Sequence, residues 1–99
     1  MLDRKRQVSG MYRITLECDG VPASAGEEAA RDITEEFRSH YPHEKNVICS
    51  WDGKILRLVA ENDYDDEGLN LTDEFSDTIA SYIEPFDGDI RLIGIKAII

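Results

Sequence analysis

Residues 11–19 alternate between apolar and polar side chains. One side of this segment is apolar along its whole length: Tyr12, Ile14, Leu16 and Cys18. A period of two is typical of a β-strand that buries one face. Gly20 and Pro22 follow, and both residue types interrupt strands. The pattern therefore predicts a strand over 11–19 that ends at Gly20.

The segment between Ser24 and Tyr41 repeats its apolar residues at spacings of three and four, which is the period of an amphipathic helix. Its apolar stripe is Ala30, Ile33, Phe37 and Tyr41. Ser24 and Glu27 have the spacing of a capping box, in which each side chain accepts from the other residue's backbone N–H. Pro42 cannot continue a helix. We therefore predict a helix that is capped by Ser24 and ends before Pro42.

A second helix is predicted after an acidic loop at 62–68. Asn70 or Thr72 is expected to cap it. Its apolar stripe is Leu71, Phe75, Ile79, Tyr82 and Ile83. Pro85 stops the helix, and residues 89–99 then form the last predicted strand.

Asp52-Gly53 separates two extended segments, 46–51 and 54–61. Two residues of this type between extended segments are the strongest short-range signal of a β-hairpin. A two-residue turn sets the register of the two strands. The pairs expected on the core side are Trp51–Lys54, Cys49–Leu56 and Val47–Leu58. The pairs expected on the opposite side are Ser50–Ile55 and Ile48–Arg57.

The predicted order of elements is β-α-β-β-α-β. The commonest arrangement for this order is a ferredoxin-like sandwich, an antiparallel sheet in the order 4-1-3-2 with two helices on one face. We predict this α+β fold as a single domain over 11–99, preceded by a flexible N-terminal tail over 1–10. The expected core is Tyr12, Ile14, Leu16, Cys18, Val47, Cys49, Leu56 and Leu58, with Ile33, Phe37, Phe75, Ile79 and Ile83 from the helices.

The chain of 99 residues is strongly acidic, with a formal net charge of −10. From Gln7 onward it carries 8 basic and 20 acidic residues. Such a surface repels nucleic acid and anionic membranes and attracts basic partners. No segment is long and apolar enough to span a bilayer, and no secretory signal follows the basic residues near the start. We therefore expect a cytoplasmic protein.

The densest acidic segment, 63–74, can be aligned with an EF-hand calcium loop. The calcium ligands would be Asp63, Asp65, Glu67 and Glu74. Two features oppose this hypothesis: a strand rather than a helix precedes the loop, and Leu71 belongs to the apolar stripe of the following helix. The alternatives are a solvated acidic loop and a docking surface for a basic partner.

Other patterns that carry chemistry are weak. His40, His43 and Glu44 surround Pro42, which breaks the helical spacing that a metal site on one helix face would need, so we interpret them as a surface helix terminus. The sequence has no nucleophile motif, no phosphate-binding glycine loop and no setting that would activate a cysteine. We expect no catalytic residues and no cofactor, with calcium as the one exception.

The sheet face opposite the helices is expected to carry apolar residues. These are Ile48, Ile55 and Val59, which lie around Arg57. An exposed apolar face of this kind favours a contact surface, and we expect a homodimer or partner interface through these four residues. The outward positions of the two predicted central strands hold no aromatic residue, which argues against base stacking and RNA binding.

We therefore expect a small non-enzymatic protein-interaction module that binds a basic partner, in the manner of an inhibitor, an immunity protein or a regulatory domain, and self-associates through its sheet. The expected partner contacts are Glu28, Asp32, Glu35, Glu36, Asp63, Asp65, Asp66 and Glu67. Two alternatives remain open. One is a calcium-responsive domain that uses the 63–74 loop, and the other is a small-ligand sensor or small enzyme with a pocket of mixed polarity.

Overall fold

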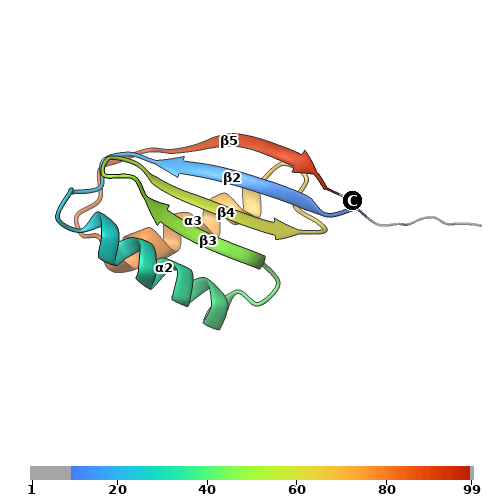
Figure 1. Cartoon of the computed structure of the whole chain (residues 1–99), viewed down its shortest axis with the longest axis horizontal. Coiled ribbons are helices and arrows are strands. Elements are labelled where there is room, and N and C mark those ends of the chain that lie inside the picture. Colours follow the sequence, from blue (N-terminus) through green and yellow to red (C-terminus); the bar gives the residue numbers. More distant parts are fainter. Residues whose placement is uncertain (1–9, 99) are drawn as a thin grey trace, which may run out of the picture.

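The chain folds into four strands and two helices in a computed structural model, which describes residues 10–98 (Figure 1). The elements are β2 (Tyr12–Cys18), α2 (Gly26–His40), β3 (Lys45–Trp51), β4 (Leu56–Asn62), α3 (Leu69–Tyr82) and β5 (Ile90–Ala97). This succession confirms the predicted β-α-β-β-α-β order and the α+β class. Apart from Gly10, the predicted N-terminal tail lies outside the described residues.

The four strands form one antiparallel sheet in the order β3-β4-β2-β5. Numbered along the chain and read from β5, this is the predicted order 4-1-3-2. Both α2 and α3 lie against the same face of the sheet, and within the described residues no helix covers the other face (Figure 1). No helix in residues 10–98 has the length and apolar character needed to cross a membrane.

The core lies between the sheet and the two helices. The apolar side of β2 is fully buried at Ile14, Leu16 and Cys18, each 0% exposed. It packs against the apolar stripes of the helices, which include Ile33, Phe37, Leu71, Phe75 and Ile79. Of the predicted core residues, Tyr12 and Trp51, the latter expected at the edge of the core, are half-buried rather than buried. The periods of two and of three to four along the chain therefore identified the core.

The hairpin at Asp52-Gly53 has a longer loop than the predicted two-residue turn. Trp51 at the end of β3 pairs with Leu56 rather than with Lys54. Oδ1 of Asp52 accepts hydrogen bonds from the backbone N–H groups of Lys54 (2.8 Å) and Ile55 (2.7 Å), which stabilises a four-residue loop. The predicted register is therefore wrong by two residues. A shift of two leaves every side chain on its predicted face of the sheet.

The start of α2 differs from the predicted cap at Ser24. The N-cap residue is Ala25, whose N–H donates to the carbonyl of Pro22 (2.9 Å), and no side chain caps the helix. The first helical residue, Gly26, lies against the indole of Trp51, where a Cβ atom would come within 2.2 Å of the ring. The start of the helix packs against Trp51, and no serine hydroxyl caps it. The capping-box prediction is therefore wrong.

Candidate functional site

Four of the acidic side chains predicted to contact a partner belong to α2, and all four are exposed or half-buried. Glu35 lies 3.9 Å from Arg38, and Glu36 lies 2.8 Å from His40. Two others have no ion-pair partner within residues 10–98: Glu28 and Asp32. The outer surface of α2 therefore carries negative charge that its own basic residues compensate only in part.

The acidic side chains of the sheet are instead paired with arginines. Three such pairs lie on or directly beside the strands: Arg13–Glu61, Arg57–Glu17 and Arg91–Asp19. The nitrogen–oxygen distance is 2.9 Å in the first pair and 2.8 Å in the third. The hydrogen bond from Arg91 holds the pKa of Asp19 below its usual range. The sheet thus neutralises its own acids, and the uncompensated negative charge lies elsewhere, on the helices and loops.

The four residues predicted for a sheet-face interface lie on or beside the face that no described helix covers. Ile48 pairs with Val59 across β3 and β4 and is 60% exposed. Ile55 and Val59 are half-buried. Arg57 is held by its ion pair with Glu17. Ile48 is therefore the most exposed apolar side chain of this group.

Asp65 was expected to face a partner, but it is buried and only 5% exposed. Its carboxylate oxygens accept hydrogen bonds from the backbone N–H groups of Asn70 (3.3 Å) and Leu71 (2.9 Å). These N–H groups belong to the first turn of α3 and have no partner within the helix. Asp65 therefore supplies the capping interaction that was predicted for Asn70 or Thr72, and the Thr72 hydroxyl donates to the carbonyl of Gly68 instead.

The structure does not assemble the predicted calcium ligands Asp63, Asp65, Glu67 and Glu74. Within residues 10–98, one group of three ligating side chains has donor atoms within 4.8 Å of one another, and it contains only Glu74 from this set. Asp65 is directed into the helix as a cap, while Asp63, Asp66 and Glu67 are exposed. These four carboxylates do not converge in the described residues, and calcium binding by the loop stays a prediction.

Glu74 lies instead beside His43 and Glu44, which belong to the connection between α2 and β3. Nε2 of His43 is 2.7 Å from Oε2 of Glu74 and 3.6 Å from Oε2 of Glu44. The sequence pattern placed these two residues with His40, which pairs with Glu36 instead. His43 and Glu74 are 31 positions apart, so only the packing of α3 beside this connection brings them together.

Glu44 is the buried member of this cluster, with a side chain that is 0% exposed. Its Oε1 accepts a hydrogen bond from Nδ2 of Asn62 (2.8 Å), and its Oε2 accepts one from the hydroxyl of Tyr64 (3.0 Å). Oδ1 of Asn62 in turn accepts from the backbone N–H groups of Tyr64 and Asp65. Asn62 thus joins the acidic loop to the cluster. Its sequence signal was its place on the buried side of β4, where a polar residue requires a partner.

The ionisation of Glu74 depends on its neighbours in the cluster. Burial, followed by the hydrogen bond with Glu44, raises the pKa of Glu74 to about 7, while His43 opposes the shift. Burial and the Glu44 carboxylate also raise the pKa of the Tyr64 phenol above its usual range. Oε1 of Glu74 is buried and has no hydrogen-bond partner within the described chain. The cluster therefore concentrates acidic groups whose charge its own donors do not fully satisfy.

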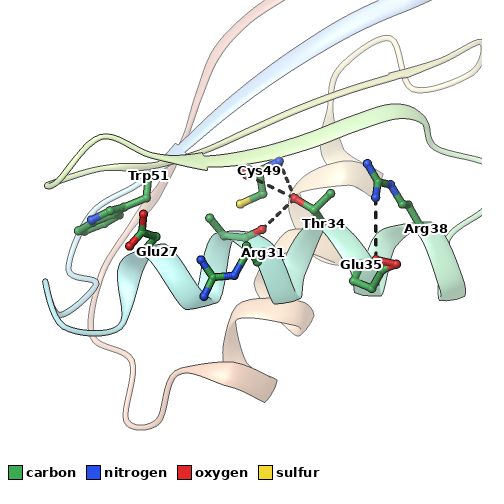
Figure 2. Close-up of a pocket in the computed structure, with 8 residues that line it drawn as sticks. Glu27, Arg31, Thr34, Glu35, Arg38, Cys49 and Trp51 are labelled. Carbon is green, nitrogen blue, oxygen red and sulfur yellow. Dashed lines mark hydrogen bonds and ion pairs between the residues drawn. The ribbon is translucent and has the colours of Figure 1, made fainter.

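A groove of about 490 Å³ lies between α2 and the edge strand β3 (Figure 2). At its floor, Oγ1 of Thr34 accepts a hydrogen bond from the backbone N–H of Cys49 (3.0 Å) and donates one to the carbonyl of Ala30 (2.8 Å). The Thr34 side chain of α2 therefore satisfies a backbone N–H group in the middle of β3, on the edge of this strand that does not pair with β4. Burial raises the pKa of Cys49 to about 12, so its thiol is not ionised at neutral pH.

Acidic and basic residues alternate along the α2 side of the groove. They are Glu27, Arg31, Glu35 and Arg38. The indole of Trp51 lies at the end of the groove near Glu27 (Figure 2). Mixed polarity around a concave surface is what the small-ligand alternative requires. The four charges are balanced, so the groove adds nothing to the net negative charge of the helix layer.

Comparison of the chain with protein-family models, with curated proteins and with solved structures gave no match.

Proposed function

We propose that this protein is a non-enzymatic interaction module whose acidic helix layer binds a basic partner. The difference in charge pairing between the two layers supports this proposal most directly. Arginines neutralise three acids of the sheet, whereas Glu28 and Asp32 on α2 have no ion-pair partner within residues 10–98. Uncompensated charge on one side of a small molecule attracts a cationic surface and orients it during association.

A ferredoxin-like sandwich is the fold that we propose for this module, because strand order and the placement of both helices agree with it. Fold alone does not specify a partner, so the proposal rests on the charges. An inhibitor, immunity or regulatory role would use them in the same way, by covering a cationic site. The exposed loop acids Asp63, Asp66 and Glu67 are further proposed contacts, and Asp65 is withdrawn because it is buried as a helix cap.

Replacing Glu28 with glutamine and Asp32 with asparagine is expected to weaken partner binding about three- to tenfold at low salt, because two attractive charges are lost. The partner would be purified with the wild-type chain as bait and the dissociation constants compared by calorimetry at two salt concentrations. The control is the double variant Glu84→Gln, Asp87→Asn, which makes the same charge change in the exposed α3–β5 connection. An acidic partner, or equal affinity for both double variants, would contradict the proposal.

We also propose that the chain forms a homodimer through the outer face of its sheet. Ile48 is 60% exposed there, and replacing it with lysine is expected to convert a dimer into a monomer in light scattering, because a charge would be buried in the contact. Leu69→Lys is the matched control, because Leu69 is 63% exposed but lies at the start of α3. A wild-type chain that is monomeric at high concentration would contradict this interface.

The groove between α2 and β3 favours a second candidate function, the binding of a small zwitterionic or polar ligand. Trp51 lines this groove and is the only tryptophan of the chain. Ligand binding is therefore expected to change the fluorescence of the protein, and Arg31→Gln is expected to weaken the response by removing one charge of the wall. A library of small polar ligands that leaves the emission spectrum unchanged would count against this candidate.

A further inference from the structure

We propose that His43, Glu44 and Glu74 bind a divalent transition-metal ion, with Zn²⁺ as the best-fitting member of that class. The site differs from both the acidic surface of α2 and the predicted calcium loop. Its three side chains come from the α2–β3 connection and from α3, and their donor atoms lie within 4.8 Å of one another. One nitrogen donor and two carboxylate donors therefore already lie close together.

The spacing of these donor atoms is close to what zinc requires. Zinc bonds to imidazole nitrogen and carboxylate oxygen are about 2.0–2.2 Å long, so tetrahedral ligands lie about 3.4 Å apart. Nε2 of His43 is 2.7 Å from Oε2 of Glu74 and 3.6 Å from Oε2 of Glu44. The first distance is shorter and the second is longer than the separation of about 3.4 Å between tetrahedral zinc ligands. The side chains of His43 and Glu74 are 46% and 15% exposed, so neither is fully buried, and we expect both to rotate slightly to surround one ion.

Glu44 is held in the way that metal-binding carboxylates are held, by hydrogen bonds from behind. Asn62 and Tyr64 donate to its two oxygens, and its side chain has no exposure to solvent. Glu74 contacts His43 through Oε2, and its Oε1 is buried without a hydrogen-bond partner in residues 10–98. A bound cation would supply the positive charge that this oxygen lacks.

The donor set selects the class of ion. An imidazole nitrogen with carboxylate oxygens suits zinc and its neighbours among the transition metals, whereas calcium and magnesium prefer oxygen ligands alone. Three protein donors also leave the fourth position of a tetrahedral ion free for water or an external ligand. The half-exposed ring of His43 provides a path from solvent to the site.

Zinc at this site would connect two segments that are distant in sequence, the α2–β3 connection and α3. An ion that binds the folded chain but not the unfolded chain raises the melting temperature. Because the acids Glu28 and Asp32 are not part of the cluster, the metal site and the proposed partner surface can succeed or fail independently.

The test uses the full chain, freed of metal by chelation and titrated with zinc chloride in a calorimeter. We expect one ion per chain at micromolar zinc or below, together with a rise in melting temperature. Glu74→Gln preserves the shape of the side chain and is expected to weaken binding about tenfold or more. Its melting temperature in metal-free buffer is expected to stay close to that of the wild type, because glutamine keeps a hydrogen-bonding side chain of the same shape beside His43 and Glu44. Loss of zinc binding would then not reflect unfolding.

His40 provides a matched control for His43. The chain has only these two histidines, and His40 also contacts a glutamate, at 2.8 Å from Glu36. We expect His43→Ala to abolish the zinc response and His40→Ala to leave the affinity unchanged. In nitrogen-15 spectra of the imidazole rings, zinc should shift Nε2 of His43 and leave His40 unaffected.

Three results would overturn the proposal. The first is the absence of saturable one-to-one binding at micromolar zinc. The second is a zinc response that disappears with His40→Ala but persists with His43→Ala. The third is stabilisation by calcium but not by zinc, because that preference would require oxygen donors without His43.

Discussion

Asn62→Ala is expected to lower the free energy of unfolding by about 2–4 kcal/mol. The substitution removes the donor to Oε1 of Glu44 and the acceptor for the backbone N–H groups of Tyr64 and Asp65. It therefore leaves a fully buried carboxyl group short of a donor and releases the turn that leads into α3. Burying a polar group without its partner costs more than losing an exposed hydrogen bond.

Urea denaturation followed by circular dichroism measures this change. The control is Asn70→Ala, which makes the same substitution at an exposed position of α3 and is expected to alter stability by no more than about 0.5 kcal/mol. Equal urea midpoints for the two variants would show that Asn62 does not support the cluster. Because Asn62 orients Glu44, the variant is also expected to lose affinity for zinc.

Gly88→Ala is expected to destabilise the protein by at least about 2 kcal/mol, because the new methyl group has no space. A Cβ atom at Gly88 would lie 1.9 Å from the carbonyl oxygen of Asp19. Backbone rather than a flexible side chain makes this contact, so the chain itself must move. The same two segments are joined by hydrogen bonds between Asp19 and Asp89, which extend the pairing of β2 with β5. Moving them apart would therefore weaken the edge of the sheet as well.

Gly94→Ala is the matched control for this prediction. Gly94 lies in β5, and a Cβ atom there would meet nothing within 4 Å. Its stability is expected to equal or slightly exceed that of the wild type, because alanine restricts the unfolded chain more than glycine does. Thermal unfolding should therefore show a lower midpoint for Gly88→Ala and no decrease for Gly94→Ala, and a Gly88→Ala variant that melts with the wild type would contradict the close approach.

Elements with a regular apolar period could be predicted from the sequence. The alternation through Ile14, Leu16 and Cys18 identified the buried face of β2, and the stripes around Phe37 and Phe75 identified the buried faces of the two helices. These patterns are local consequences of burying one face of a strand or helix. The order of the strands followed from the sequence of elements and the usual handedness of their connections.

Details set by single side-chain hydrogen bonds could not be predicted in the same way. The Asp52 carboxylate accepts hydrogen bonds from two backbone N–H groups, which favours the longer hairpin loop. The sequence Asp52-Gly53 fits a two-residue turn equally well. The Asp65 carboxylate caps α3 from outside the helix, where the sequence offered Asn70 and Thr72 at ordinary cap positions. In both cases several polar residues compete for the same backbone groups, and tertiary packing decides between them.

The candidate metal site could be predicted only in its parts. His43 and Glu44 are adjacent in the sequence, whereas the sequence pattern assigned Glu74 to the predicted calcium loop. Their convergence depends on the contact between the α2–β3 connection and α3, which has no local sequence signal. The most informative residue in retrospect is Asn62, because a polar side chain in the buried series of β4 indicates a polar partner inside the fold.

The hydrogen bond that the backbone N–H of Cys49 donates to Thr34 has a consequence for how copies of this chain can aggregate. A fibre that grows by strand addition needs two free strand edges on every molecule, one for each of its two neighbours. Because Thr34 occupies the middle of the β3 edge, β5 is the edge that remains available for strand addition within the described sheet. Pairing of β5 with β5 of another copy would use both free edges at once, so that edge-to-edge growth would terminate at two molecules.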